Sequence, residues 1–127
     1  MSKPTFVDDY AAITETLNKY NQRVAKADSA IMKPAFAKEA TIFSAKDGAL
    51  DGGAIAGLFE GIDTAFKATP ESRYAIAYID ITGTAASARV DTNDSSDGQC
   101  FTDYFHLLKI NGTWTILSKI FHSHPIA

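Results

Sequence analysis

Two apolar runs near the end of the chain, separated by Asn111-Gly112, predict a long β-hairpin over residues 99–124. Both turn residues tolerate the positive φ angles of a two-residue type I′ turn, so Asn-Gly between apolar runs is a strong hairpin signal. With two residues in the turn, Ile110 pairs with Thr113, and every further pair follows from this register.

In this register, one face of the hairpin is mostly large and apolar, which predicts that it faces the core. It carries Phe101, Asp103, Phe105, Leu107, Trp114, Ile116, Ser118, Ile120 and His122. The opposite face carries Thr102, Tyr104, His106, Leu108, Thr115, Leu117, Lys119 and Phe121. Asp103 and His122 are therefore expected as diagonal neighbours on the inward face, about 5–8 Å apart between Cβ atoms.

Apolar residues at spacings of three and four predict helices in the first half of the chain. The first helix begins after Thr5. Asp28 is expected to cap a second, short helix that runs to Phe36 and that Pro34 makes irregular. A third helix is expected to begin near Ala54, after a break at Gly52-Gly53, and to end at Thr69-Pro70. Its apolar stripe is Ile55, Leu58, Phe59, Ile62 and Phe66.

The remaining strands are expected at 40–44, 74–82 and 85–92, the last two joined by a turn at Gly83-Thr84. In that second hairpin, the small and aliphatic residues fall on one face: Ala75, Ala77, Ile79, Ile81, Ala86, Ala88 and Val90. Helices first and an antiparallel meander last predict an α+β fold, with the helices on one face of a curved sheet.

Length and composition are those of one soluble globular domain over residues 1–127, with 46% hydrophobic and 21% charged residues. A net charge of −3 gives no reason to expect nucleic acid or an anionic membrane as a partner. Cys100 is the only cysteine, so no internal disulfide can form. No apolar run approaches the roughly 20 residues of a membrane span. The N-terminus has no hydrophobic signal core, which predicts a cytoplasmic protein.

The order helix, short helix, strand, helix and long hairpins resembles the nuclear transport factor 2-like (SnoaL-like) superfamily over nearly the whole chain. That group includes ketosteroid isomerases, scytalone dehydratase and SnoaL-type polyketide cyclases. The tail FTDYFHLLKINGTWTILSKIFHSHP is similar to the closing segment of the lumazine-binding (Lumazine_bd_2) family. The stretch DYAAITETLNKYNQRVAKADSAIMKPAFAKEATI is similar to its opening. The resemblance implies a cone-shaped, cystatin-like fold with three helices on the concave face of an antiparallel sheet.

Two function classes remain open, and a dimeric partner module is a third interpretation. One is a protein that binds a small organic molecule in an apolar pocket inside the cone. The other is a cofactor-free isomerase, dehydratase or cyclase that uses Asp103 and His122 as a general acid and base. A purely structural hydrogen bond between those two residues is a further interpretation. The expected pocket wall is Tyr20, Phe36, Phe43, Phe59, Phe101, Phe105 and Ser118.

His122 and His124 have a spacing that can serve a metal, but Asp103 is the only further acid expected on their face. Zinc takes three or four protein ligands, so no metal site is predicted, and no cofactor. The outward hairpin face carries more apolar side chains than a solvated strand needs, which predicts a two-fold homodimer packed through it. Its contact residues would be Tyr104, His106, Leu108, Leu117 and Phe121.

Overall fold

The computed structural model describes residues 6–26, 28–64, 72–93 and 98–125. The helices are α1 (Phe6–Lys26), α2 (Ser29–Met32) and α3 (Ala56–Thr64), with a 3-10 turn at Lys33–Ala35. The strands are β1 (Phe36–Lys46), β2 (Ala49–Ala54), β3 (Arg73–Thr82), β4 (Ala85–Asn93), β5 (Cys100–Ile110) and β6 (Thr113–His124). Thr5, Phe66 and Thr69-Pro70, used above to place helix ends and a helix face, lie outside the described residues.

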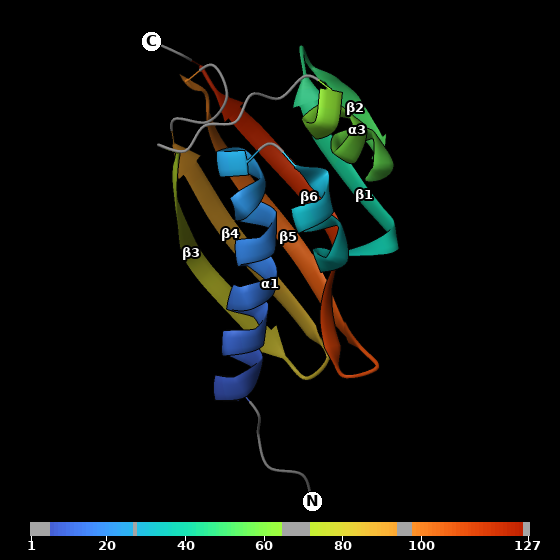
Figure 1. The fold of residues 1–127 in the computed structure, drawn as a ribbon, viewed down its shortest axis with the longest axis vertical. Helices are drawn as coiled ribbons and strands as arrows, with labels where there is room; N and C mark the ends of the chain where they lie inside the picture. The colour runs from blue at the N-terminus through green and yellow to red at the C-terminus, as the bar shows by residue number, and fades with distance from the viewer. Residues whose placement is uncertain (1–5, 27, 65–71, 94–97, 126–127) are drawn as a thin grey trace, which may run out of the picture.

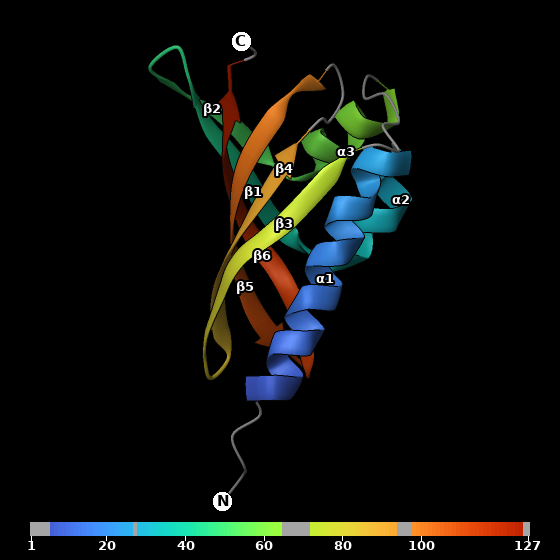
Figure 2. The same ribbon diagram turned by 90° about the vertical axis from the view of Figure 1, so that its left-hand side faces the viewer.

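The six strands form one sheet in the order β2-β1-β6-β5-β4-β3, in which only β1 and β6 run parallel. The sheet is curved, and the helices all lie on one side of it (Figure 2). α1 crosses that side along β4 and β5, while α3 lies near β2 (Figure 1). The predicted α+β architecture is therefore confirmed. We call the helix-covered side of the sheet the inner face and the other side the outer face.

The start of the short helical segment follows its sequence signals. The side chain of Asp28 accepts a hydrogen bond from the Ala30 amide at 2.9 Å, which caps α2. Pro34 lies in the 3-10 turn that follows, so the helix ends at Met32 instead of continuing to Phe36. Asp63 of α3 accepts hydrogen bonds from the Ser29 amide and hydroxyl, at 2.9 and 2.6 Å, and so joins α3 to α2.

The segment 49–54 is a strand, whereas the glycine pair Gly52-Gly53 predicted a break there. Gly52 lies opposite Phe43 with φ +144°, and a Cβ on it would lie 2.0 Å from the carbonyl oxygen of Ile42. Glycine is therefore required at this position for β2 to pair with β1. β1 is longer than expected because β2 on one edge and β6 on the other both hydrogen-bond to it.

The β3–β4 hairpin has the expected turn but not the expected register throughout. A bulge between Ile76 and Tyr78 shifts the pairing, so that Ile76 pairs with Val90 and Ala75 with Asp91. Ala75 therefore lies on the outer face, while Ile76 takes its place on the inner face. The exchange puts a larger apolar side chain under the helices.

The core lies between α1 and the inner face of the sheet. Buried residues of α1 pack against buried residues of β4, β5 and β6, among them Ile13, Leu17, Val90, Phe105, Leu107 and Ile116. Trp114 and Lys109, at the closed end of the β5–β6 hairpin, both donate hydrogen bonds to Asp9 Oδ1, at 3.0 and 2.9 Å. These bonds hold the first turns of α1 against that hairpin. Among the described helices, none has the length and apolarity that a membrane span needs.

Candidate functional site

β6 contains one residue more than the hairpin register allows. Leu107 pairs with Ile116 as expected, but His106 pairs with Ser118, so Leu117 is an unpaired bulge residue. Such a bulge shifts the pairing by one position, and side chains alternate between faces with a period of two. Every side chain of β6 beyond the bulge therefore lies on the face opposite to the one predicted.

The predicted pairing of Asp103 with His122 is wrong for this reason. Asp103 pairs with Phe121 and lies on the inner face, whereas His122 pairs with Thr102 and lies on the outer face. The predicted contact therefore cannot form across the sheet. In place of His122, the bulge turns Lys119 inward, where it pairs with Phe105.

Three polar side chains form a buried group on the inner face, which we call the buried triad: Asp103, Tyr20 and Lys119. The Tyr20 hydroxyl donates to Asp103 Oδ2 at 3.0 Å, and Lys119 Nζ donates to the Tyr20 oxygen. Lys119 Nζ lies 3.5 Å from the second carboxylate oxygen, Oδ1, as an ion pair. Asp103 and Tyr20 are fully buried, and Lys119 is 3% exposed. The triad is thus an acid, a hydroxyl and an amine in an apolar environment.

Two further buried polar side chains, one on α1 and one on β4, have no hydrogen-bond partner among the described residues. Neither amide atom of Asn21 nor the hydroxyl of Thr92 finds a partner in the described part of the chain, and Asp103 Oδ1 accepts no hydrogen bond there either. Asn21 follows Tyr20 on α1. Thr92 pairs with Phe101, two positions from Asp103 along the inner face. Hydrogen-bonding capacity therefore remains unused among the described residues at Asn21, at Thr92 and at Asp103 Oδ1.

The predicted pocket-wall residues divide between the two faces. Tyr20, Phe105, Phe36 and Phe59 form an edge-to-face aromatic series, with ring centroids 4.9, 6.0 and 5.7 Å apart in successive pairs from Phe105 through Tyr20 and Phe36 to Phe59. Phe101 is also on the inner face, 6.3 Å from the ring of Phe121. Ser118 and Phe43 were expected inside, but their pairs are Thr41–Ser118 and Phe43–Ile120, which places both on the outer face. The β6 bulge explains Ser118, and the parallel pairing with β6 explains Phe43.

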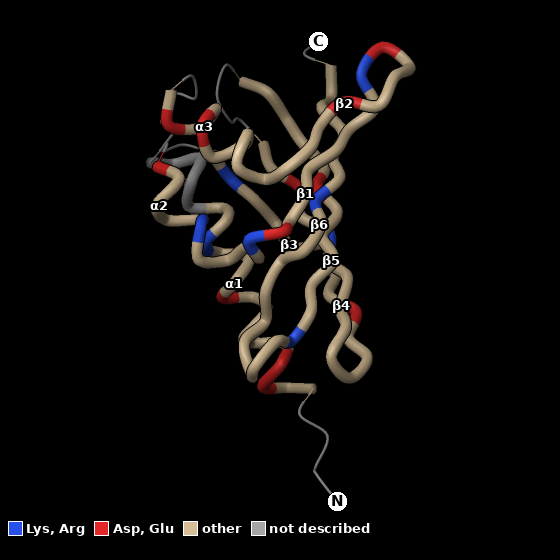
Figure 3. Tube along the Cα trace, turned by 90° about the vertical axis from the view of Figure 1, so that its right-hand side faces the viewer, with Lys and Arg blue, Asp and Glu red and all other residues tan. Residues whose placement is uncertain are grey.

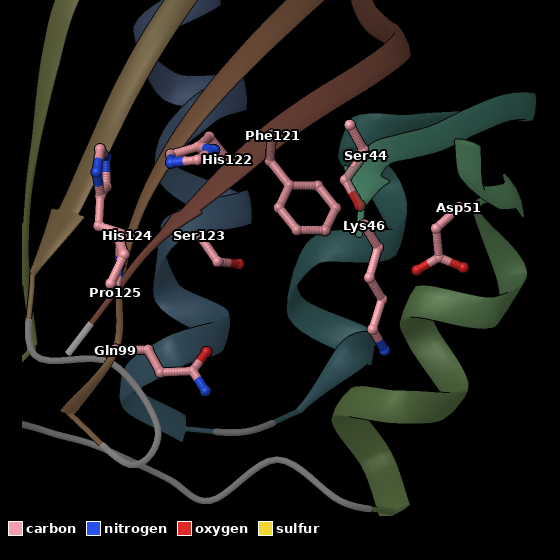
Figure 4. Close-up of a pocket in the computed structure, with 10 residues that line it drawn as sticks. Ser44, Lys46, Asp51, Gln99, Phe121, His122, Ser123, His124 and Pro125 are labelled. Atoms are coloured by element: carbon pink, nitrogen blue, oxygen red, sulfur yellow. The ribbon is translucent and has the colours of Figure 1, made fainter. Parts of the chain in front are cut away.

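A pocket of about 650 Å³ opens where β1 and β6 separate, and we call it the gap pocket. Its lining comprises Ser44, Ala45, Lys46, Asp51, Gln99, Phe121, His122, Ser123, His124 and Pro125. Figure 4 shows Phe121 and Ser123 pointing from β6 toward the β1 side, with His122 and His124 on the other side of the strand. Phe121 also contacts Lys119, since Nζ lies 4.9 Å from the ring centroid. This one ring therefore lies between the open pocket and the amine of the buried triad.

The outer face carries a separate polar group around Asp91. Arg89 donates to this carboxylate at 3.0 and 3.2 Å and Thr102 donates at 2.6 Å, while His124 Nε2 lies 2.8 Å from the Thr102 hydroxyl. Burial raises the pKa of Asp91, but the hydrogen bonds from Arg89 and Thr102 and the nearby positive charges outweigh burial and hold that pKa below its usual value. The same contact raises the pKa of Arg89.

Sequence reasoning did not find Lys119, Tyr20 and Asn21 as polar site residues. Lys119 was expected on the outer face, and Tyr20 was treated only as an aromatic wall residue. In the predicted register His122 already supplied the inward polar partner that a buried Asp103 requires, so no signal in the sequence pointed to Lys119. No three His, Cys, Asp or Glu side chains within the described ranges are grouped as a metal site would need. Acidic and basic residues are interspersed along the trace in Figure 3, without a stripe of one sign.

Comparison with known proteins identifies the class of fold first. The solved structure of an NTF2-like protein of unknown function from Shewanella baltica is 54% identical, with a TM-score of 0.93 over 98% of this chain and 100% of that chain. A second NTF2-like protein of unknown function, from Methylobacillus flagellatus, is 37% identical, with a TM-score of 0.84 over 94% of each chain. The fold is that of the nuclear transport factor 2-like superfamily.

Residues 8–122 match the Lumazine_bd_2 family model, whose description is "Putative lumazine-binding". The chain belongs to this family. A curated relative, "Aldolase FrzH" from a Cladobotryum species, is 31% identical over 98% of this chain and 99% of its own length. The predicted family membership is therefore confirmed.

The environment of Asp91 predicts a pH-dependent contribution to stability. We expect Asp91→Asn to lower the free energy of unfolding at pH 7, because it removes the charge that Arg89 neutralises. The folded-state pKa is lower than the unfolded value of about 3.9, so this contribution is complete above that value and is lost as the pH falls through the folded pKa. Urea unfolding of both proteins at pH 7 and near pH 3 measures the difference.

Asp80→Asn is the matched control, since Asp80 is an exposed acid on the outer face of β3. A gap between wild type and Asp91→Asn that stays the same at both pH values would contradict the ionic explanation.

Proposed function

We propose that this protein binds a small organic molecule on the inner face of the sheet, between α1 and strands β4 to β6. The proposed site lies toward the C-terminal end of β6, at the top of Figure 1, and we call this region the upper inner face. The observation that carries the proposal is that the buried polar atoms of Asn21 and Thr92 have no hydrogen-bond partner among the described residues. A buried donor or acceptor left without a partner costs about 1–3 kcal/mol. Three such buried atoms are therefore expensive in an empty protein, and a ligand that pairs with them would remove the cost.

The arrangement supports a route to these atoms. Across the inner face, Thr92 pairs with Phe101 and Phe101 pairs with Ser123, and Ser123 lines the gap pocket. A ligand that enters through this pocket would pass over Phe101 and Phe121 and reach Thr92 and Asn21 within the width of three strands. A flat molecule suits this route, because aromatic rings line it and planar ligands stack on them.

The unpaired groups also favour a ligand with neighbouring donor and acceptor atoms. An asparagine side chain offers one acceptor and two donors in a plane, so it can pair with the edge of a heterocycle that carries both N–H and C=O groups. The family description names lumazine, a flat heterocycle of this kind. This chemistry supports a heterocyclic or carbonyl-containing ligand, and the family description alone does not assign lumazine.

Removal of the unpaired groups should make the empty protein more stable. We expect Asn21→Leu and Thr92→Val each to raise the free energy of unfolding by about 1 kcal/mol, since each removes an unpaired polar group with little change in volume. The same exchanges should weaken binding of a ligand found by mass spectrometry of the purified protein. Urea unfolding and calorimetric titration measure the two effects.

Thr102→Val is the matched control, because its hydroxyl is bonded to Asp91 and His124 and its loss should lower stability. If Asn21→Leu and Thr92→Val are destabilising and leave ligand binding unchanged, the proposed site is wrong.

A second candidate function, catalysis of proton transfer, is favoured by the buried triad. A carboxylate, a phenol and an amine in mutual contact can accept and return a proton beside a bound molecule. Isomerases, dehydratases and cyclases need this step, and so does an aldolase, the activity that the name of the Cladobotryum relative states. Here Asp103, with Oδ1 free of hydrogen bonds from the described residues, is the proposed base, and His122 has no part in it.

The catalytic candidate predicts that the protein accelerates exchange of the protons beside the carbonyl group of hydroxyacetone in D₂O. Asp103→Asn should reduce this acceleration by about 10²–10⁴-fold. NMR follows the exchange, and circular dichroism checks that the variant is folded. His122→Asn is the control and should exchange protons as the wild type does. Equal rates in wild type and a folded Asp103→Asn variant would rule out this role.

We also propose that two copies associate through the outer face. Tyr104 and Ile120 are 38% and 50% exposed there, and with Phe43 and Leu50 they border an apolar groove of about 370 Å³. Phe121, also predicted as a contact of this interface, pairs with Asp103 and also lines this groove. Sedimentation equilibrium at micromolar concentration should give a dimer, and Ile120→Lys should give a monomer. Ile110→Lys, at the hairpin end, is the control, and a monomeric wild type would contradict the proposal.

A further inference from the structure

We propose that Lys119 forms a covalent imine with an aldehyde or ketone group of the bound molecule. This inference rests on the proposed function, because it assumes a small molecule on the upper inner face, and it adds the chemical class of the ligand. It is carried by the position of the amine. Lys119 Nζ lies in a largely aromatic environment, 4.7 Å from the ring centroid of Tyr20 and 4.9 Å from that of Phe121.

The two ring faces attract an ammonium, but the burial of Lys119 makes the charged form of the amine costly. Lys119 is 3% exposed, and an ammonium group removed from water loses its hydration. Its ion pair with Asp103 Oδ1 is 3.5 Å long, beyond the usual length of a charge-assisted hydrogen bond. A proton passed from the amine to the carboxylate replaces two buried charges by two neutral groups, and a neutral amine is the form that attacks a carbonyl carbon.

The Tyr20 hydroxyl is placed to carry that proton. It accepts from Lys119 Nζ and donates to Asp103 Oδ2, so it joins the two groups in a continuous hydrogen-bonded chain. Tyr20 can therefore pass one proton to Asp103 while it receives one from Lys119. Asp103 then holds the proton that the later step requires.

The complete reaction balances within these groups and the carbonyl compound. Lys119 ammonium transfers one proton through Tyr20 to Asp103, and the free amine then forms a bond from nitrogen to the carbonyl carbon. A proton moves from that nitrogen to the former carbonyl oxygen, which gives a neutral carbinolamine. Asp103 returns its proton to the new hydroxyl group, the carbon–oxygen bond breaks, and water leaves. The product is a protonated imine and one water molecule, with no change in oxidation state.

Access comes from the gap pocket. Phe121 lines that pocket and contacts Lys119 Nζ, so rotation of one side chain would bring the amine to a carbonyl compound held there. Lys109 differs from Lys119 in its partner and in its exposure. Its Nζ donates to Asp9 at 2.9 Å, and its side chain is 30% exposed. Lys119 is thus distinguished by its position against the pocket wall and by its triad, and this combination is typical of an activated amine.

The test uses 2,4-pentanedione, a small diketone whose imine with a lysine rearranges to a stable enaminone. The folded protein is exposed to the diketone for timed intervals and then digested. Mass spectrometry of the peptides gives a modification rate for each lysine. We expect Lys119 to react at least about tenfold faster than exposed Lys38 of β1, although burial alone would make it slower. A rate at Lys119 equal to or below that at Lys38 would overturn the inference.

Two variants separate activation from exposure. Tyr20→Phe retains the ring and removes the proton relay, so it should slow modification of Lys119 by about tenfold and leave Lys38 unchanged. Phe121→Ala opens the pocket wall and should speed modification of Lys119 alone. If Tyr20→Phe leaves the ratio of the two rates unchanged, the triad does not activate the amine and the inference fails.

The outcomes for this inference and for the proposed function are distinct. If Asn21→Leu and Thr92→Val weaken ligand binding as expected while Lys119 reacts no faster than Lys38, the site binds its ligand without a covalent bond. If Lys119 reacts rapidly while those two variants leave binding unchanged, the amine is active but the ligand does not use the unpaired groups.

Discussion

The unpaired Leu117 in β6 determines which polar groups enter the interior of this protein. Before the bulge along β6, Trp114 and Ile116 pack into the core as regular alternation requires. After the bulge, the alternation of side chains between the two faces is reversed, so that Lys119 and Phe121 point inward and His122 points outward. Bulges often redirect side chains next to functional sites, and here the redirected side chains are those that contact Asp103 and line the gap pocket.

The buried triad is a costly way to fill a core. A buried ion pair often contributes no more stability than apolar residues of the same volume, because both charges lose their hydration. The triad is placed where the sheet is otherwise packed with Phe105, Val90 and the rings of α1 and β1. The amide of Asn21 and the hydroxyl of Thr92, for which the described part of the chain offers no partner, add to the same cost. A binding or catalytic role gives this concentration of polar atoms a physical reason that stability does not.

The two faces of the sheet use their polar residues differently. On the outer face, Arg89, Asp91, Thr102 and His124 satisfy one another at the surface, where water shares the cost of each charge. On the inner face, the carboxylate of Asp103 depends on two side chains from elements that are distant in sequence, Tyr20 of α1 and Lys119 of β6. The inner group therefore depends on how α1 and β6 pack against β5.

The sequence by itself determined the class of fold, the helix α1, the cap at Asp28 and both hairpin turns, because these depend on local periodicity and turn chemistry. It also placed Asp103 on the buried face, since that part of β5 follows directly from the Asn111-Gly112 turn. Only the tertiary structure decided the partner of Asp103. The β6 bulge depends on pairing with β1 and β5 at once, and no local pattern in residues 113–124 marks Leu117 as the extra residue. The contact with Tyr20 likewise depends on how α1 packs across the sheet, 83 residues away in sequence. Local sequence fixes which side chains a strand carries, whereas the sum of its neighbours fixes the direction in which they point.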